Sequence, residues 1–109
     1  MNGQRVESVA IVGAGAMGAA YASMFAVAEG FSPFFLASGE RYQRLSEEQL
    51  IVNGKSYAVP VRRPQEVTGP ADLVLVALKH HHLEAALAEI APLVGQGTIV
   101  VSVMNGLRS

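Results

Sequence analysis

The sequence predicts an α/β fold, a doubly wound parallel sheet with a β-hairpin insertion. Two observations predict it: short apolar runs of strand length alternate with segments of helical periodicity, and the runs lack the polar alternation of a half-exposed strand. Half of the 109 residues are hydrophobic and only 16% are charged, which suits a sheet buried on both faces. Right-handed crossovers between the strands would make this sheet doubly wound. At this length, residues 1–109 are expected to form one domain with one core.

The first predicted strand, residues 9–12, leads into a glycine-rich turn and then a helix. Gly13, Gly15 and Gly18 have the spacing G-x-G-x-x-G in the strand-to-helix context that this fingerprint requires. The glycines would permit the tight turn, the approach of a pyrophosphate to the backbone, and close helix packing. A diphosphate would then bind at the helix N-terminus. The pattern predicts a Rossmann-type dinucleotide-binding domain, the alternative being an ordinary glycine-rich turn. The candidate cofactor-binding residues here are Gly13, Ala14, Gly15, Ala16, Met17 and Gly18.

The first helix is expected to pack on the sheet through one apolar stripe and to end at Gly30. A second strand, residues 33–37, follows and enters the loop 38–41. The stripe consists of Met17, Ala20, Tyr21, Met24, Phe25 and Ala28.

A charged helix is expected over residues 40–49, followed by a β-hairpin. Its strands would be residues 50–52 and 56–61, joined by the Asn53-Gly54 turn that favours tight hairpins. This hairpin interrupts the simple alternation of strands and helices.

The last third of the sequence predicts a buried interior strand at residues 72–78, a helix at 82–94 and another buried strand at 98–103. Pro92 falls within the helical pattern, so the last turn is expected to be broken or kinked. The apolar face of this helix comprises Leu83, Ala86, Leu87, Ile90, Ala91 and Val94.

In a doubly wound sheet, ligands bind beyond the carboxyl ends of the strands. The turn 13–18, the loop 38–41, Lys79 and Asn105 all follow predicted strands. These segments are therefore expected to converge on one crevice.

The end of the second strand usually determines whether NAD or NADP is preferred. Ala37 and Ser38 bring no carboxylate there, whereas Arg41, the Ser38 hydroxyl and the Gly39 N–H suit the 2′-phosphate of NADP. Glu40 favours NAD instead, because it lies about 20 residues beyond Gly18, where an NAD-type acidic residue is expected. NADP is favoured and NAD stays possible.

Lys79 and Asn105 are the candidate residues for catalysis and for positioning the cofactor and substrate. Lys79 could hold a ribose or a substrate carboxylate, or it could simply reach solvent from the strand end. The Asn105 amide could reach into the crevice, or form an Asn-Gly turn. His82, in a run of three histidines, is expected near the adenine; the run lacks the spacing of a metal site, so no metal is predicted.

The composition argues against several classes of protein. Eight Lys and Arg against nine Asp and Glu provide no broad basic face for nucleic acid. No secretory signal or membrane-spanning run is evident, and the chain has no cysteine for disulfides or thiolate metal sites. A cytoplasmic protein is therefore expected.

The motifs together resemble the ketopantoate reductases. The similarity rests on G-A-G-A-M-G at 13–18, S-G-E-R at 38–41, V-A-L-K at 76–79 and N-G-L at 105–107. It implies an NADPH-binding N-terminal domain of a 2-dehydropantoate 2-reductase, an oxidoreductase that reduces the ketone of 2-dehydropantoate to pantoate in pantothenate biosynthesis. In that family the glycines hold the diphosphate, while the strand-end lysine and the asparagine, here Lys79 and Asn105, face cofactor and substrate.

The chain departs from the family pattern in two places. Where the family commonly reads R-G after its second strand, this chain has Ser38-Gly39, so binding of the 2′-phosphate would pass to Arg41. A glutamine often found shortly after the lysine is replaced by His82. The family's helical C-terminal domain, which supplies the general-acid lysine and a substrate-binding carboxylate, is expected to be absent from this chain. The isolated domain should then bind a dinucleotide without catalysis. Its expected partners are a 2-oxoacid substrate, the missing domain and a second copy in a homodimer.

Two other functions fit the same motifs. One is the cofactor domain of a different NAD(P)-dependent dehydrogenase of the 2-hydroxyacid type, since a fold does not define a substrate. The other is a stand-alone NAD(P)-sensing module. An exposed apolar face, where a further domain would pack, favours an enzyme domain over a sensor.

Overall fold

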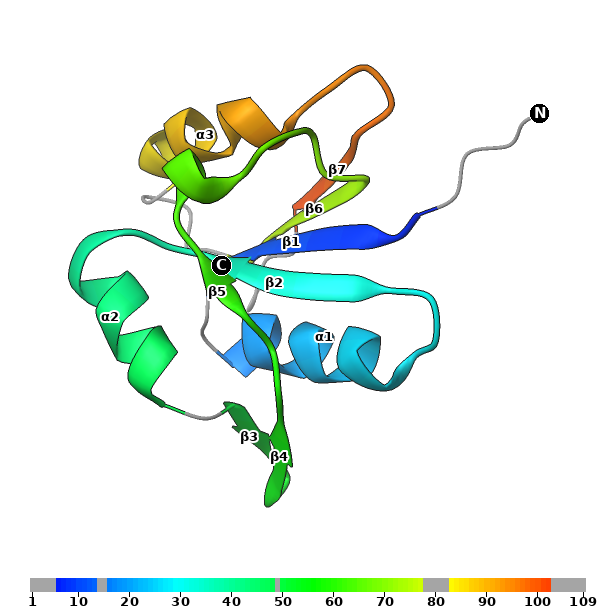
Figure 1. Cartoon of the computed structure of the whole chain (residues 1–109), viewed down its shortest axis with the longest axis vertical. Helices are drawn as coiled ribbons and strands as arrows, with labels where there is room; N and C mark the ends of the chain where they lie inside the picture. The colour runs from blue at the N-terminus through cyan, green and yellow to red at the C-terminus, as the bar shows by residue number, and fades with distance from the viewer. Residues whose placement is uncertain (1–5, 14–15, 49, 78–82, 103–109) are drawn as a thin grey trace, which may run out of the picture.

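The computed structural model describes residues 6–13, 16–48, 50–77 and 83–102, excluding the side chains of residues 16–17 and 83–86. Its centre is a five-stranded parallel sheet in the order β5-β2-β1-β6-β7 (Figure 1). The sheet strands are β1 (Ser8–Val12), β2 (Ser32–Leu36), β5 (Val61–Arg62), β6 (Leu73–Val76) and β7 (Ile99–Ser102). The remaining elements are α1 (Ala16–Val27), α2 (Gly39–Glu47), the hairpin β3 (Leu50–Val52) and β4 (Lys55–Tyr57), η1 (Pro64–Glu66), α3 (Leu83–Ile90) and η3 (Ala91–Leu93).

The central strand β1 is buried on both faces. Val9 and Ile11 belong to a core cluster with Ala22 of α1, whereas Ala10 and Val12 belong to a second cluster with Ile90 and Leu93. Helix α1 lies on one side of the sheet and α3 on the other (Figure 1). This is the predicted doubly wound α/β architecture, and it explains why β1 has no polar alternation.

The carboxyl ends of the interior strands are level. Val12 at the end of β1 pairs with Leu36 of β2 and with Val76 of β6. The next residue of β6, Ala77, donates its N–H to the Val12 carbonyl over 2.8 Å. The turn after β1 and the loop after β2 therefore begin at the same edge of the sheet.

At the amino edge of the sheet, Asp72 connects the beginning of β6 to the beginning of β1 by hydrogen bonds. Its Oδ2 accepts the backbone N–H groups of Glu7 at 2.9 Å and Ser8 at 3.1 Å. Its own N–H donates to the Ser8 hydroxyl oxygen at 2.9 Å. The bonds from the Glu7 and Ser8 N–H groups favour the carboxylate and lower the pKa of Asp72.

The apolar stripe predicted for α1 is partly wrong. Gly18 and Ala22 face the sheet and Phe25 packs against the same cluster, while Ala20 is exposed and Met24 is 60% exposed. The sequence of α1 contains no charged side chain, so periodicity could not select one face. The close approach of Gly18 to the preceding turn orients the helix instead.

The predicted hairpin forms, but its second strand is shorter than expected. The run 56–61 divides into β4, which pairs with β3 around Asn53-Gly54, and β5, which joins the main sheet. Asn53 and Gly54 have φ values of 54° and 78°, as a tight hairpin turn requires. The Pro60 carbonyl accepts the Phe35 N–H at 2.9 Å, so this segment continues along β2 rather than along β3.

The C-terminal helix and strand also differ from the prediction. Helix α3 ends at Ile90, and the turn containing Pro92 is the 3₁₀ helix η3, which confirms the expected break. Ile90 and Leu93 are buried, but Leu87, Ala91 and Val94 are exposed. Strand β7 was expected to be buried and is exposed along its length, because it is an edge of the sheet within the described residues.

Candidate functional site

Gly13 and Gly18, on either side of the turn between β1 and α1, have the geometry that their positions predict. Gly13 has a φ of +100°, a value that side-chain-bearing residues rarely adopt. A Cβ on Gly18 would overlap with the Gly13 carbonyl oxygen and lie 3.0 Å from its carbonyl carbon. Glycine at position 18 thus lets the first turn of α1 rest directly on the strand end.

The N-terminus of α1 opens at the carboxyl edge of the sheet. The helix begins at Ala16, three residues after Gly13, and the first N–H groups of a helix have no partner within it. Ala14 and Gly15 lie outside the described residues, as do the side chains of Ala16 and Met17. The structure describes Gly13 and the helix backbone from Ala16 onward, and a helix N-terminus of this kind can bind an anionic group such as a diphosphate.

The second segment of the site is the loop that connects β2 to α2. Ser38 is the N-cap of α2 with extended backbone angles, and Gly39 has a φ of +64°. The Ser38 hydroxyl makes no capping hydrogen bond to α2. It instead donates to Glu89 Oε2 of α3 over 2.6 Å, which leaves the first N–H groups of α2 without a side-chain cap.

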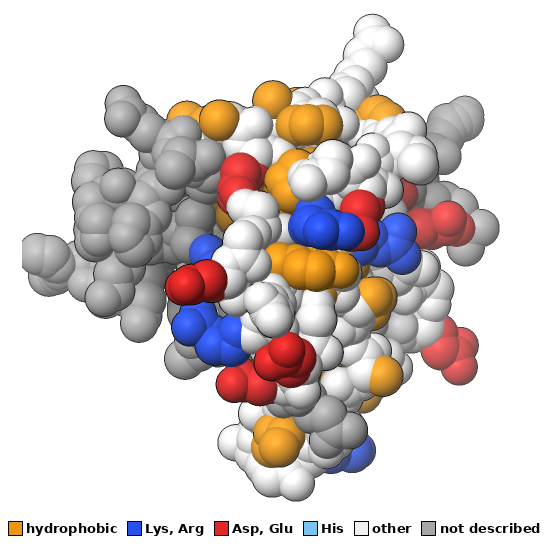
Figure 2. Space-filling model, turned by 60° about the vertical axis from the view of Figure 1, so that its left-hand side comes forward, with side chains coloured by type: hydrophobic (Ala, Val, Ile, Leu, Met, Phe, Trp, Pro, Cys, Tyr) orange, Lys and Arg blue, Asp and Glu red, His pale blue; other side chains and the backbone are white. Residues whose placement is uncertain are grey.

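Arg41 lies in the first turn of α2, where it is half-buried. Its guanidinium makes no ion pair with another described residue. The neighbouring Glu40 is exposed. Acidic and basic side chains are interspersed on the face that includes α2, so no single sign of charge dominates it (Figure 2).

Glu89 is a residue of this region that the sequence did not reveal. It lies in α3, 51 positions after Ser38, and no local pattern distinguishes it from an ordinary exposed helix residue. Only the packing of α3 beside the β2 end brings its carboxylate to Ser38.

The remaining predicted site residues, Lys79, His82 and Asn105, lie outside the described residues. Strands β6 and β7, which precede Lys79 and Asn105 in the chain, are parallel to β1 and run toward the same edge. In the part of the chain that the structure describes, no group of three or more metal-ligating side chains comes together. None of the described helices is long and apolar enough to cross a membrane.

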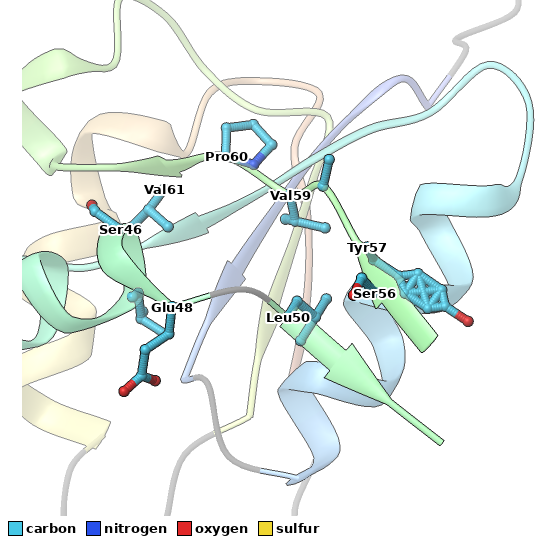
Figure 3. Close-up of a pocket in the computed structure, with 10 residues that line it drawn as sticks. Ser46, Glu48, Leu50, Ser56, Tyr57, Val59, Pro60 and Val61 are labelled. Carbon is cyan, nitrogen blue, oxygen red and sulfur yellow. The ribbon is translucent and has the colours of Figure 1, made fainter. Parts of the chain in front are cut away.

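A cavity of about 680 Å³ lies between α2, the hairpin and β5, away from the glycine turn (Figure 3). Its walls include the apolar side chains of Leu45, Leu50, Val59 and Val61, each also in contact with the core cluster under α1. Ser46, Glu48 and Ser56 contribute polar groups to its lining. None of the predicted cofactor-binding residues that the structure describes lines it.

Comparison with known proteins identifies the family of the chain. Residues 9–109 match the family model described as Ketopantoate reductase PanE/ApbA. A 2-dehydropantoate 2-reductase of Mesorhizobium japonicum is 37% identical over 103 residues, which is 91% of this chain and 32% of the relative. The chain therefore spans about a third of the length of such relatives.

Solved structures show the same relationship. A Ralstonia solanacearum protein assigned as a ketopantoate reductase has a TM-score of 0.76 and 38% identity, with 94% of this chain and 33% of that chain covered. A D-mandelate dehydrogenase in ternary complex with NADH and anilino(oxo)acetate has a TM-score of 0.73 and 28% identity, with coverages of 93% and 34%. The fold described above is thus shared with about the same fraction of both proteins.

Proposed function

Because this chain belongs to the ketopantoate reductase PanE/ApbA family, we propose that it is the dinucleotide-binding domain of an NADPH-dependent 2-dehydropantoate 2-reductase. The observation that carries the proposal is the close packing of Gly18 on the Gly13 carbonyl. This contact orients the start of α1 toward the carboxyl edge of the sheet, where a diphosphate can accept its N–H groups.

The described part of the glycine segment supports such a cofactor, because Gly13 has a positive φ and Gly18 packs on the Gly13 carbonyl. Ala14, Gly15, Ala16 and Met17 would complete the segment that follows the diphosphate. The bound nicotinamide would supply the hydride for ketone reduction. The protein's own contribution would be to orient cofactor and substrate, with Lys79, His82 and Asn105 as the further contacts at the strand ends.

A preference for NADPH is supported by the start of α2. Arg41 has no ion-pair partner among the described residues, and the first turn of α2 lacks a side-chain cap. A guanidinium and free N–H groups are the donors that bind a phosphate. Arg41 would therefore bind the 2′-phosphate, with Ser38 beside it.

The substrate would be a small 2-oxoacid, held over the nicotinamide by groups from this domain and from further protein. Lys79 and Asn105 would position it from this side. The chain spans about a third of its relatives, so the general acid and the substrate-binding carboxylate would come from a C-terminal helical domain. Hydride transfer requires both the orientation and the proton, so residues 1–109 by themselves would be inactive.

Exposed apolar surface supports a domain that packs against further protein. Met24 and Val27 of α1 are 60% and 65% exposed, and Ile99, Val100 and Val101 of β7 are exposed by 39% to 51%. Apolar surface of this kind is typical of an interface, whereas a self-contained sensor would cover it. A second copy of the chain in a homodimer is the other partner that could cover it.

Calorimetric titration of this chain with NADPH and with NADH tests the proposal. Arg41→Ala should weaken NADPH binding by about tenfold or more and leave NADH nearly unchanged, because only NADPH carries the 2′-phosphate. Arg44→Ala is the matched control, since Arg44 is exposed in the last turn of the same helix. Equal losses for both cofactors would show that Arg41 does not bind the 2′-phosphate, and binding of neither cofactor by the wild type would overturn the proposed function.

A further inference from the structure

The hydrogen bond between Ser38 and Glu89 connects the start of α2 to α3. At 2.6 Å between Ser38 Oγ and Glu89 Oε2, it has the short length of a hydroxyl that donates to a charged carboxylate. It joins the N-cap residue of α2 to a residue of α3 that lies 51 positions later in the chain. The bond therefore holds a negative charge at the end of β2.

This location is the position of the adenosine ribose in a dinucleotide-binding sheet. A carboxylate there accepts a hydrogen bond from the ribose 2′-hydroxyl of NADH, but it repels the 2′-phosphate of NADPH. The sequence after β2 provides no such carboxylate in its first two residues, Ala37 and Ser38. Glu89 brings one there from a different helix.

We propose that Glu89 is a specificity-determining residue of the cofactor site. Its carboxylate, hydrogen-bonded to Ser38, repels a ribose 2′-phosphate and so lowers the ratio of NADPH affinity to NADH affinity. The inference rests on the proposed function, because it assumes a dinucleotide at this edge of the sheet. Arg41 attracts the 2′-phosphate and Glu89 repels it, so these two side chains together determine the ratio of NADPH affinity to NADH affinity.

Glu89 is better placed for this role than Glu40, the acidic residue that lies closer in sequence. Glu40 is exposed, and its carboxylate makes no hydrogen bond with another described residue. Glu89 is half-buried, and its carboxylate is held by the very hydroxyl that would otherwise donate to the phosphate. For the Ser38 hydroxyl to donate to the 2′-phosphate of NADPH, its hydrogen bond to Glu89 would have to break or be shared with the phosphate.

The test compares Glu89→Gln with Glu29→Gln in titrations of this chain with NADPH and NADH. Glutamine keeps the size of the side chain and an oxygen that can accept from Ser38, so it removes only the charge. Glu29 is exposed and precedes β2, at the other end of that strand, and its replacement changes the net charge by the same amount. Glu89→Lys serves as a second variant, with a larger change expected in the same direction.

We expect Glu89→Gln to raise the ratio of NADPH affinity to NADH affinity by roughly tenfold, and Glu29→Gln to leave the ratio unchanged. If Glu89 had a purely structural role, its replacement would weaken the binding of both cofactors equally and leave the ratio of their affinities unaltered. An unaltered ratio in both Glu89 variants, with wild-type binding intact, overturns this inference and leaves the proposed function standing. Failure of the wild type to bind either cofactor overturns the proposed function and the inference with it.

Discussion

Replacement of Gly18 by alanine tests whether the contact between α1 and the glycine turn supports the fold. In most helix interiors this change stabilises a protein, because alanine favours the helix by up to about 1 kcal/mol over glycine. At position 18 the added Cβ would overlap with the Gly13 carbonyl oxygen and lie 3.5 Å from Ile11 Cγ2. The first obstacle is backbone, which cannot rotate away as a side chain can.

The cost follows from how the overlap must be relieved. Either α1 withdraws from the sheet or the turn at Gly13 changes, and withdrawal opens a gap beneath Ala22, which is completely buried. A gap of about 0.5–1 Å removes a quarter to a half of each van der Waals contact across it. Overpacking usually costs about 1–3 kcal/mol and backbone overlap lies at the upper end, so we expect a net loss of about 2–3 kcal/mol.

Urea denaturation followed by far-UV circular dichroism measures this loss. Gly69→Ala is the matched control, because a Cβ there meets no atom within 4 Å, and we expect its stability to change by less than about 1 kcal/mol. A Gly18→Ala variant whose urea midpoint equals or exceeds that of the wild type would refute this expectation. Such a result would mean that α1 does not approach the Gly13 carbonyl as closely as the structure shows.

Three further predictions concern the core, the amino edge of the sheet and the hairpin. Leu93→Ala should lower the free energy of unfolding by about 2–5 kcal/mol, because Leu93 is completely buried; a loss below 1 kcal/mol in urea titration would contradict this burial. The backbone bonds from Glu7 and Ser8 lower the folded-state pKa of Asp72, so its stabilising effect is complete above about pH 4 and is lost as the pH falls through the folded-state pKa. Asp72→Asn should therefore flatten the decline of thermal stability at acid pH, and an unchanged pH profile would exclude this role. Gly54→Ala should cost about 1–2 kcal/mol in thermal melts, because Gly54 has a φ of +78°, whereas an unchanged melting temperature would show that the hairpin contributes nothing to the cooperative fold.

The order of elements was predictable from the sequence because it depends on local physics. Strand β1 is buried on both faces, and a continuous apolar run is the pattern that such a strand leaves. Asn53-Gly54 specified a hairpin turn, since both residues tolerate positive φ. Pro92 indicated the end of α3, because proline cannot donate the helical hydrogen bond.

The face that a helix buries and the partner that a strand chooses were less predictable. Helix α1 has no charged side chain, so its orientation depends on the contact between Gly18 and Gly13 rather than on periodicity. The division of the run 56–61 into β4 and β5 depends on the free edge of β2, which is distant in sequence. The exposure of β7 depends on its edge position, which no feature of its own apolar run records.

The candidate site divides in the same way. By itself, the sequence determined the glycine turn, the loop after β2 and the family, because these depend on residues close together in the chain. Only the tertiary structure brought the Glu89 carboxylate to the Ser38 hydroxyl, since that contact requires α3 to pack beside the end of β2. The physical reason is that backbone conformation follows from neighbouring residues, whereas the charge around a ligand is summed over every element that reaches it.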